Sequence, residues 1–516
     1  MTIHSRHSPT LQMVEPNTRK ATATIPPGKG AAKLSKNDSK RKFEDGEDIK
    51  PVKFKQPKTN KDAISASVPK NPKKKIVESP LTTAPSRRLD LYVFGGNSAA
   101  ELGLGPGHRS QTVEEPLRND CLSSASVGVV QVATGGMHCV ALTFDNKILT
   151  WGGNDHGALG RDTTWDGGLV DMDGSDSDSE GGQLNPRECT PTEVDATEIP
   201  AATVFTQVAA GDNASFAVTN MGQVYGWGTF RTIEGGFGFS PAVKVQERPT
   251  LVPELKKITK VVVGSNHALA LTSKGTVFVW GWGQQGQLGR QICTRRILQS
   301  LVPREFSRPK KIVDIGAGSE HSFAVAIDGT VYGWGSNSHG QTGMVSNAGE
   351  GEAVTIAPTA IKSLKGFGRI MTITGGNHHS IAVTDKQECL VWGRADNYAL
   401  GIEFDSLPTD SVILNARGKP GILKLPTRIP DLRAVFASSG SDHCIAIAKD
   451  HRAFSWGFNN DGQTGQVPDK DKDLTEVEVA TLLDPPSLKG KTLVWAGAGG
   501  QFSIIATKPA KAIGVR

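Results

Sequence analysis

The sequence predicts an all-β fold, a seven-bladed β-propeller, because two signatures recur along the chain. The first is an aromatic residue followed by glycine at the end of a short strand, and its seven copies lie 53 to 76 residues apart. The second is a run of small residues and glycine that leads into an apolar strand. A repeat of this length holds about four strands with their loops, which is the content of one propeller blade. The aromatic–glycine pairs begin at Phe94, Trp151, Trp227, Trp280, Trp334, Trp392 and Trp456.

The segments between the signatures have the composition of strands. Residues 277–280 and 331–334 are rich in β-branched and aromatic residues, and Gly, Asn, Asp and Pro flank them. The repeats show no apolar period of 3.6 residues over three turns, which disfavours helices. Small-residue runs such as 209–211 suit inner strands, where side chains crowd around a central axis.

The order of the signatures predicts how the ring closes. The first signature in the chain is an aromatic–glycine half and the last is a small-residue half, so we expect the two ends to complete one blade together. An open solenoid would need a polar capping repeat, and the sequence offers none. The predicted propeller covers residues 89–508, and residues 509–516 form a short tail. Its predicted repeats are 89–147, 148–222, 223–275, 276–329, 330–387, 388–452 and 453–508.

The first 88 residues differ in composition from the rest. They carry 20 Lys and Arg against 8 Asp and Glu, a net charge of +12, whereas the remainder has a net charge of −6. They are rich in Pro, Lys, Ser and Thr and poor in large apolar residues, which predicts a disordered tail. Two basic clusters in the tail indicate nuclear import or nucleic-acid contact, with a solvated charge run as the alternative. The clusters are Lys40, Arg41 and Lys42, and Lys73, Lys74 and Lys75.

Several site classes are disfavoured by the sequence. No apolar segment follows Met1 and no run of 18 apolar residues occurs, so neither a secretory signal nor a membrane span is expected. Six scattered cysteines without a CxxC pair predict free thiols, and no metal site or cofactor is expected. The GxGxxG match at 281–286 belongs to the repeated turn, since no helix follows it. The acidic stretch 171–180 reads as a solvated loop, with Ser175, Ser177 and Ser179 as candidate phosphorylation sites.

Departures from the repeat indicate a functional face. A histidine recurs at one position of five repeats, which favours a structural role for His138, His267, His321, His379 and His443. His378 is an additional histidine next to that position, and Asp212 and Asn266 lie on equivalent loops. Polar, variable positions at one end of a repeat ring are where a partner is recognised. In residues 228–239 the usual turn is replaced by a segment with three Phe and four Gly, and we expect exposed apolar tips that insert into a partner.

These stretches resemble, each in the matching repeat, the regulator of chromosome condensation family, the nuclear exchange factors for the small GTPase Ran. The resemblance covers about residues 89–508. The stretches that carry it are 135–138 (Gly-Gly-Met-His), 153–163, 227–231 (Trp-Gly-Thr-Phe-Arg), 286–290 and 375–379.

The resemblance implies a guanine-nucleotide exchange factor that promotes GDP release from Ran without covalent chemistry, a metal or a cofactor. It implies catalytic roles for Asp212, Asn266 and His378, where Asn266 and also Ser98 replace acidic residues of the family. The implied GTPase-binding wedge spans residues 229–239 and includes Thr229, Phe230, Arg231, Glu234 and Phe237.

The resemblance also implies further partners and a location. Arg295 and Arg296 match a loop that binds histones, and the basic tail would contact DNA and importin. The protein would then act in the nucleus, on chromatin, in nucleocytoplasmic transport and cell-cycle control. Two alternatives are a non-exchanging propeller scaffold that binds other proteins and a propeller enzyme with titratable groups in its channel. The small residues of the predicted inner strands disfavour the enzyme.

Overall fold

The computed structural model describes residues 79–167, 184–232, 235–306, 308–407, 409–467 and 474–509, all of which belong to one compact unit. These residues form thirty strands, one short α-helix (α1, Pro186–Cys189) and six 3-10 helices. No helix in this part of the chain has the length and apolar character needed to cross a membrane. The predicted basic clusters at 40–42 and 73–75, the acidic stretch 171–180 and Glu234 lie outside the described residues.

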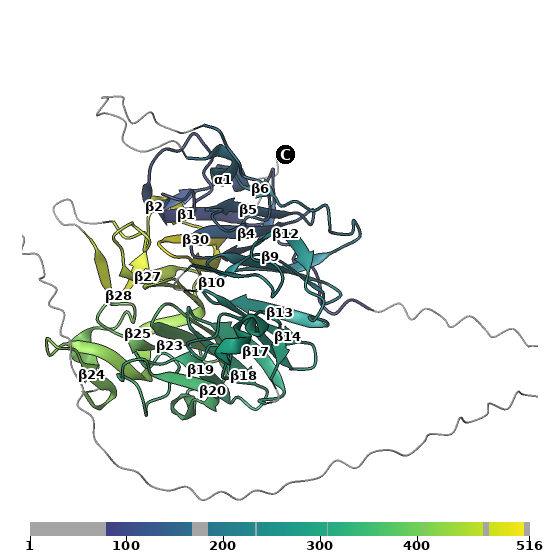
Figure 1. Ribbon diagram of the computed structural model, residues 1–516. Helices are drawn as coiled ribbons and strands as arrows, with labels where there is room; N and C mark the ends of the chain where they lie inside the picture. Colours follow the sequence, from purple (N-terminus) through teal and green to yellow (C-terminus); the bar gives the residue numbers. More distant parts are fainter. Residues whose placement is uncertain are drawn as a thin grey trace, which may run out of the picture. The chain divides into compact units, whose positions relative to one another are not determined.

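Five antiparallel sheets of four strands and one eight-stranded sheet that holds two blades form seven blades, which follow one another in chain order around the molecule (Figure 1). We number the blades from the first inner strand. From the inner to the outer strand, blade 1 is β3 (Val129–Thr134), β4 (His138–Thr143), β5 (Ile148–Gly152) and β6 (Thr192–Glu193); blade 2 is β7 (Phe205–Ala210), β8 (Ala214–Thr219), β9 (Val224–Gly228) and β12 (Gln246–Leu251); blade 3 is β13 (Ile258–Val263), β14 (His267–Thr272), β15 (Val277–Gly281) and β16 (Arg304–Glu305); and blade 4 is β17 (Ile312–Ala317), β18 (His321–Ala326), β19 (Val331–Ser336) and β20 (Val354–Ala360).

Blades 5 and 6 share one long strand, β25 (Pro420–Ser439). Its first part pairs with β23 at the edge of blade 5 and with β24 (Val412–Leu414), and its last part is the inner strand of blade 6. The other strands are β21 (Ile370–Gly375), β22 (His379–Thr384) and β23 (Glu388–Arg394) in blade 5; β26 (His443–Ala448), β27 (Ala453–Phe458) and β28 (Glu476–Leu483) in blade 6; and β29 (Leu493–Ala498), β30 (Phe502–Thr507), β1 (Asp90–Gly96) and β2 (Thr112–Arg118) in blade 7.

The ring closes as the signatures predict. Blade 7 joins the two ends of the chain, because β1 pairs with β30 and places Phe94 opposite Ser503. Each inner strand contacts the next one around the axis, and β29 of blade 7 contacts β3 of blade 1. The prediction that the chain ends complete one blade together is confirmed. Each sequence repeat therefore runs from the third strand of one blade to the second strand of the next.

The propeller unit begins earlier than the predicted boundary at residue 89. The backbone N–H of Leu81 donates to the carbonyl of Asn220 at 2.7 Å, and the hydroxyl of Thr82 donates to that of Thr206 at 3.1 Å. The guanidinium of Arg88 lies 4.4 Å from the ring centroid of Phe144. Residues 79–88 are thus held by specific contacts with blades 1 and 2. The tail's average composition could not reveal these contacts, because they depend on single side chains.

Backbone geometry explains the aromatic–glycine signature. Gly281 has φ = +112°, and a Cβ atom there would lie 2.6 Å from the carbonyl oxygen of Asn266 in the neighbouring loop. Only glycine tolerates both constraints. The preceding Trp280 is buried between blades, with its ring edge on Phe216 of blade 2 at a centroid distance of 5.4 Å. The signature therefore places a large apolar ring at each blade boundary and a sharp turn directly after it.

The repeat histidines form hydrogen-bonded joints between blades, as their repetition predicts. All five are fully buried, and in four joints Nε2 lies 2.7 to 2.9 Å from a serine hydroxyl of the next blade. The fifth, His379, contacts the thiol of Cys444 at 3.1 Å and the hydroxyl of Ser439 at 2.6 Å. Burial lowers the pKa of His267 to about 3 and the pKa of His138 and His443 to about 4. These imidazoles are therefore neutral in the fold.

Candidate functional site

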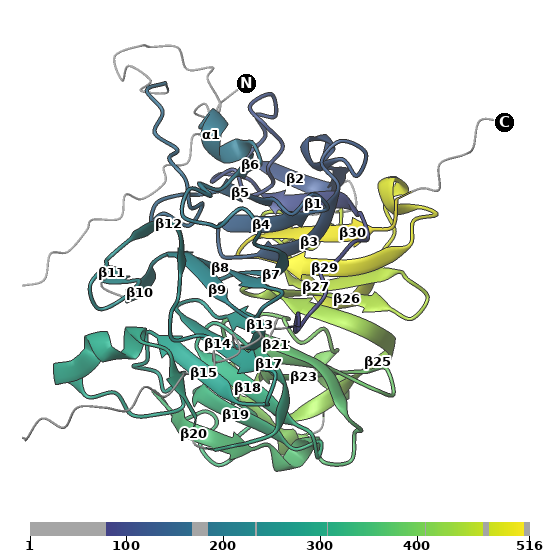
Figure 2. The same cartoon turned by 90° about the vertical axis from the view of Figure 1, so that its right-hand side faces the viewer.

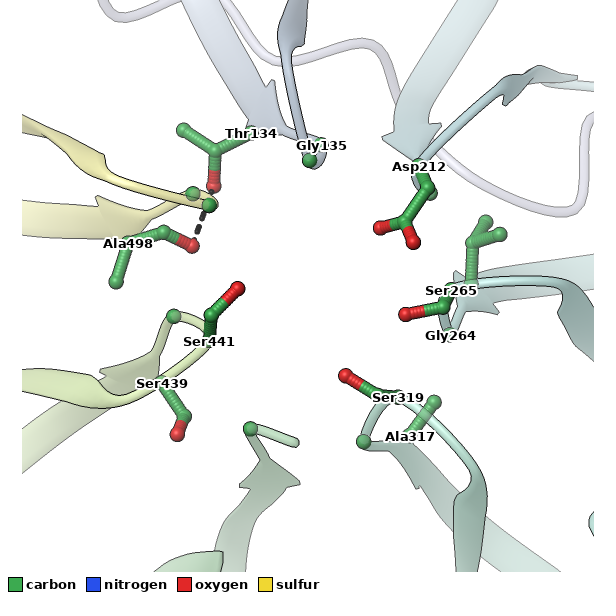
Figure 3. Close-up of a pocket in the computed structure, with 18 of the residues that line it drawn as sticks. Thr134, Gly135, Asp212, Gly264, Ser265, Ala317, Ser319, Ser439, Ser441 and Ala498 are labelled. Carbon is green, nitrogen blue, oxygen red and sulfur yellow. Dashed lines mark hydrogen bonds between the residues drawn. The ribbon is translucent and has the colours of Figure 1, made fainter. Parts of the chain in front are cut away.

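A small channel runs along the axis, where the ends of the seven inner strands meet (Figure 3). Its volume is about 170 Å³, and Gly, Ala, Ser and Thr make up most of its wall. A side chain at Gly264 would collide with the ring of His267 and with Gly318 of the next blade, which explains why such small residues are needed. Among the described residues, no group of His, Cys, Asp or Glu is arranged to hold a metal ion.

Asp212 is the charged residue among the described residues that line this channel. It follows β7, and Figure 3 shows its carboxylate directed into the channel, beside Ser265 of the next blade. Its backbone N–H donates to the carbonyl of Ser265 at 3.2 Å. Burial raises the pKa of Asp212, while a hydrogen bond with the Ser265 side chain and the positive charge of Arg231 act in the opposite direction. The carboxylate is thus partly desolvated and faces a channel that a partner's polar group could enter.

The loops between the first and second strands of all blades lie at one end of the channel, which we call the mouth. This follows because the inner strands run in the same direction around the ring. The residue before each repeat histidine position lies on these loops, and its carbonyl accepts an N–H from the chain after the aromatic–glycine pair. Examples are Thr229 to Asn213 at 2.9 Å, Trp282 to Asn266 at 2.7 Å and Arg394 to His378 at 2.9 Å. The residues in ring order are Met137, Asn213, Asn266, Glu320, His378, Asp442 and Gln501.

The segment predicted as a wedge forms a hairpin next to the mouth. Its strands are β10 (Phe230–Thr232) and β11 (Gly235–Gly238), which form a two-stranded sheet outside the blades (Figure 2). The side-chain oxygen of Asn266 accepts the backbone N–H of Arg231 at 2.7 Å, and the hydroxyl of Thr229 donates to the carbonyl of Lys244 at 2.7 Å. These two bonds fix the base of the hairpin to blade 3 and to the segment between β11 and β12.

The prediction of exposed phenylalanine tips on this segment is wrong. Phe230 is fully buried and Phe239 is 7% exposed, and both rings stack with Phe216 at centroid distances of 6.3 and 6.2 Å. Phe237 is half-buried, with its ring 5.2 Å from that of Trp282. The aromatic rings therefore extend the core between blades 2 and 3 and hold the hairpin. Of the described residues, Thr232 and Gly235, which pair with each other, lie closest to its turn, and the next residue, Gly236, is exposed.

His378 lies on the mouth of blade 5, in a polar cluster that sequence reasoning did not identify. Its ring stacks on that of His339 from blade 4, with centroids 4.4 Å apart. The neighbouring carboxylate of Asp442 accepts bonds from Asn377 at 3.2 Å and from Asn397 at 2.6 Å. Burial lowers the pKa of His378, and the charge of Asp442 acts in the opposite direction. His339 and Asn397 occupy equivalent turn positions in neighbouring repeats. Their polar side chains were the sequence signal from which this cluster could have been predicted.

The structure brings some of the predicted site residues together and separates others. Asp212, Asn266 and Arg231 are neighbours at the mouth of blades 2 and 3, whereas His378 faces the same mouth from blade 5. Ser98 is exposed in the turn after β1. Arg295 and Arg296 lie elsewhere, in the 3-10 helix η2 (Thr294–Leu301) between β15 and β16, outside the ring of mouth loops.

Comparison with known proteins agrees with this geometry. Residues 90–505 match the RCC1-like domain. The chain belongs to the RCC1-like family. It is 39% identical over 426 residues to the protein pim1 of Schizosaccharomyces pombe, covering 82% of this chain and 76% of that protein. It is 36% identical over 427 residues to the guanine nucleotide exchange factor SRM1 of Saccharomyces cerevisiae, covering 81% and 86%.

Solved structures of the RCC1-like family show the same fold. The crystal structure of Prp20p from Saccharomyces cerevisiae, which was studied for its binding to Gsp1p and histones, superposes with a TM-score of 0.74 at 33% identity. The alignment covers 84% of this chain and 94% of that one. Yeast RCC1 (Prp20) in complex with Kap60 gives a TM-score of 0.75 at 31% identity, covering 87% and 97%. The seven-bladed propeller predicted from the repeats is confirmed.

Proposed function

We propose that this RCC1-like protein is a guanine-nucleotide exchange factor for the small GTPase Ran. The observation that carries the proposal is the anchored hairpin beside Asp212 at the mouth. The two strands of the hairpin are not part of the ring, because the seven blades close without them. The similarity to SRM1, an exchange factor, supports the assignment.

Exchange by this surface requires differential binding and no covalent chemistry. A protein that binds the nucleotide-free GTPase more tightly than the nucleotide-bound form lowers the barrier to nucleotide release. The hairpin, with Thr229, Arg231 and Phe237, would compete with the contacts that hold phosphate and magnesium in the GTPase. Asp212 would pair with basic groups of Ran, and its partial burial strengthens such a pair. No step needs a cofactor on the exchange factor.

His378 would contact the GTPase as a neutral imidazole. Its burial and its stacking on His339 both favour the uncharged ring. A neutral imidazole can donate one hydrogen bond and accept another. Asn266 would act mainly through the hairpin, because its side-chain oxygen already accepts the N–H of Arg231.

Nucleotide release kinetics test the assignment. Release of labelled GDP from purified Ran should be accelerated by the full-length chain, and Asp212→Asn should slow it by about tenfold, the effect of losing about 1.4 kcal/mol of binding to the nucleotide-free state. Asp328→Asn is the matched control, because Asp328 lies in the turn between β18 and β19, at the end of the blade opposite the mouth. If the wild-type chain bound Ran without accelerating release, it would be a scaffold.

We also propose that the protein acts on chromatin in the nucleus. The supporting observations are the net charge of +12 on residues 1–88, the two basic clusters 40–42 and 73–75, and the similarity to Prp20p, which was studied for histone binding and solved with Kap60. Deleting residues 1–78 should weaken retention on nucleosomes and nuclear accumulation while exchange activity stays within about twofold, since the mouth is left intact. Loss of exchange would place the tail in the active surface.

A further inference from the structure

A pocket on the outer edge of blade 3 contains three arginines. Its volume is about 430 Å³, and Arg290, Arg296 and Arg304 line it together with Gln299 and Ser300. None of the described residues that line it is acidic. The pocket exists because β16 has only two residues, so β15 has little outer cover apart from η2. Three cations around one cavity repel each other, and that arrangement is stable only with a counter-ion or with strong solvation.

Arg290 has a buried donor without a hydrogen-bond partner next to this pocket. Its Nη1 donates to the carbonyls of Val279 at 3.1 Å and Leu288 at 3.4 Å. Its Nη2 is buried and has no hydrogen-bond partner among the described residues. Burial and the nearby charge of Arg304 lower the pKa of Arg290 to about 10. A buried donor without an acceptor is rare, and an unoccupied ligand position is a common reason for one.

The equivalent arginine of blade 1 shows how such a position is normally satisfied. Arg161 follows the same Leu-Gly turn, and β6 of that blade is also only two residues long. There α1 fills the gap: the carbonyl of Arg187 accepts from Nη1 of Arg161 at 2.7 Å, and Thr150 accepts from Nε at 3.2 Å and from Nη2 at 2.9 Å. Burial lowers the pKa of Arg161 to about 10, and the negative charge of Glu188 acts in the opposite direction.

Blade 3 has the same gap but supplies cations where blade 1 supplies acceptors. From this contrast we propose that the pocket of Arg290, Arg296 and Arg304 binds a phosphate dianion, as found at the end of a phosphate monoester. Guanidinium groups match the oxygen geometry of phosphate, and the three positive charges exceed the single negative charge of a monoanion. The oxygens would accept hydrogen bonds from the exposed guanidinium groups of Arg296 and Arg304, and their negative charge would offset the repulsion between Arg304 and Arg290. This site is separate from the mouth and does not depend on exchange activity.

The neighbouring arginine provides a matched control. Arg295 is exposed on the same helix, one residue from Arg296, but it is not among the residues that line the pocket. Arg296→Gln, Arg304→Gln and Arg295→Gln each remove one positive charge from the outer edge of blade 3. If binding depended only on the total positive charge of this edge, phosphate affinity would fall equally in all three variants. A specific site would lower the affinity only in Arg296→Gln and Arg304→Gln.

The test is calorimetric titration of the full-length chain with O-phosphoserine and with inorganic phosphate at constant ionic strength. We expect one site in the wild type and in Arg295→Gln, and at least tenfold weaker binding in Arg296→Gln and Arg304→Gln. Dimethyl phosphate and acetate, both monoanions, should bind at least tenfold more weakly than O-phosphoserine. Without ligand, Arg304→Gln should melt at a higher temperature than the wild type, since one repulsive charge is gone.

Four results would overturn the proposal. One is a wild type that binds neither phosphate probe, and another is an equal loss of affinity in all three variants. The third is equal affinity for dimethyl phosphate and O-phosphoserine, which would indicate a site for nucleic-acid backbone instead. Equal affinity for acetate would likewise indicate a carboxylate site. Since all variants lie at the outer edge of blade 3, their circular dichroism and cooperative melting check that each is folded.

Discussion

The Nε2 atom of His267 lies 2.8 Å from the hydroxyl oxygen of Ser322, across the boundary between blades 3 and 4. The Ser322 hydroxyl donates to the carbonyl of Gln287 at 3.1 Å, so its oxygen is left to accept and the imidazole carries its proton on Nε2. The indole N–H of Trp334 donates to the same carbonyl at 2.8 Å. One buried joint thus ties together a histidine, a serine, a turn and a tryptophan from two blades.

Ser322→Ala should destabilise the propeller. The substitution leaves the Nε2–H of His267 without an acceptor and removes one donor from Gln287, which should lower the free energy of unfolding by about 1–3 kcal/mol. Equilibrium denaturation measures the change. Ser273→Ala, in an exposed turn of blade 3, is the control and should stay within about 0.5 kcal/mol of the wild type. If the two variants unfold alike, the joint contributes nothing to stability.

The stability of the fold should fall as the pH falls from about 6.5 towards 4, because five histidines are buried neutral. Their folded-state pKa values lie below the unfolded value of about 6.5, so the unfolded chain binds more protons in this window. Full stability is therefore present above pH 6.5 and is lost as the pH decreases. Burial raises the pKa of Glu101 to about 7 and also raises the pKa values of Asp212, Glu188, Glu320 and Glu476, and these carboxyls act in the opposite direction. The lowered pKa values of His339 and His378 add to the effect of the five.

Denaturation midpoints between pH 7.5 and pH 4.5 check this expectation. In His267→Gln the amide keeps a neutral donor without a titrating ring, so the pH dependence should become shallower by about one proton. A midpoint that stays constant over the whole range would show that the histidines can protonate without loss of the joints. A variant slope equal to that of the wild type would remove His267 from the explanation.

The repeat made the architecture predictable, because local backbone and packing geometry requires the repeated residues. Gly281 at positive φ and a buried Trp280 before it are required by the blade itself, so they recur in every copy and can be counted. The closure of blade 7 followed from the order of the two half-signatures alone. Residues 79–88 were misplaced because their contacts, such as Thr82 with Thr206, have no periodic pattern.

The candidate site was only partly predictable, because its key contacts join residues that are distant in sequence. The sequence singled out the 228–239 segment, but it could not tell a phenylalanine in the core from one at an exposed tip. That distinction depends on Phe216 and Trp280 lying beneath the segment. Likewise, the stack of His339 on His378 joins two blades, and only the fold brings those rings within 4.4 Å.

Asn266 should support exchange by anchoring the hairpin and not by carrying charge. Asn266→Ala removes the acceptor for the N–H of Arg231, and loss of about 1–2 kcal/mol of hairpin positioning should slow GDP release from Ran by about 5- to 30-fold. Asn266→Asp keeps an oxygen at the same place and should stay within about threefold of the wild type. Stopped-flow release with labelled GDP distinguishes the two. A large gain in Asn266→Asp would show that a negative charge at this position is what matters.

Two truncations should separate the tail from the propeller at residue 79. A chain that lacks residues 1–78 retains the contacts of Leu81, Thr82 and Arg88, so its free energy of unfolding should match that of the full-length chain. A chain that lacks residues 1–88 loses four hydrogen bonds and a cation–π contact, which should cost about 1–3 kcal/mol. Both should still accelerate GDP release, because the mouth lies at the other end of the blades. The substitution Arg88→Ala in the full-length chain is the control, and it should account for part of the lost free energy of unfolding. Equal stability of both truncations would show that residues 79–88 contribute nothing to the stability of the propeller.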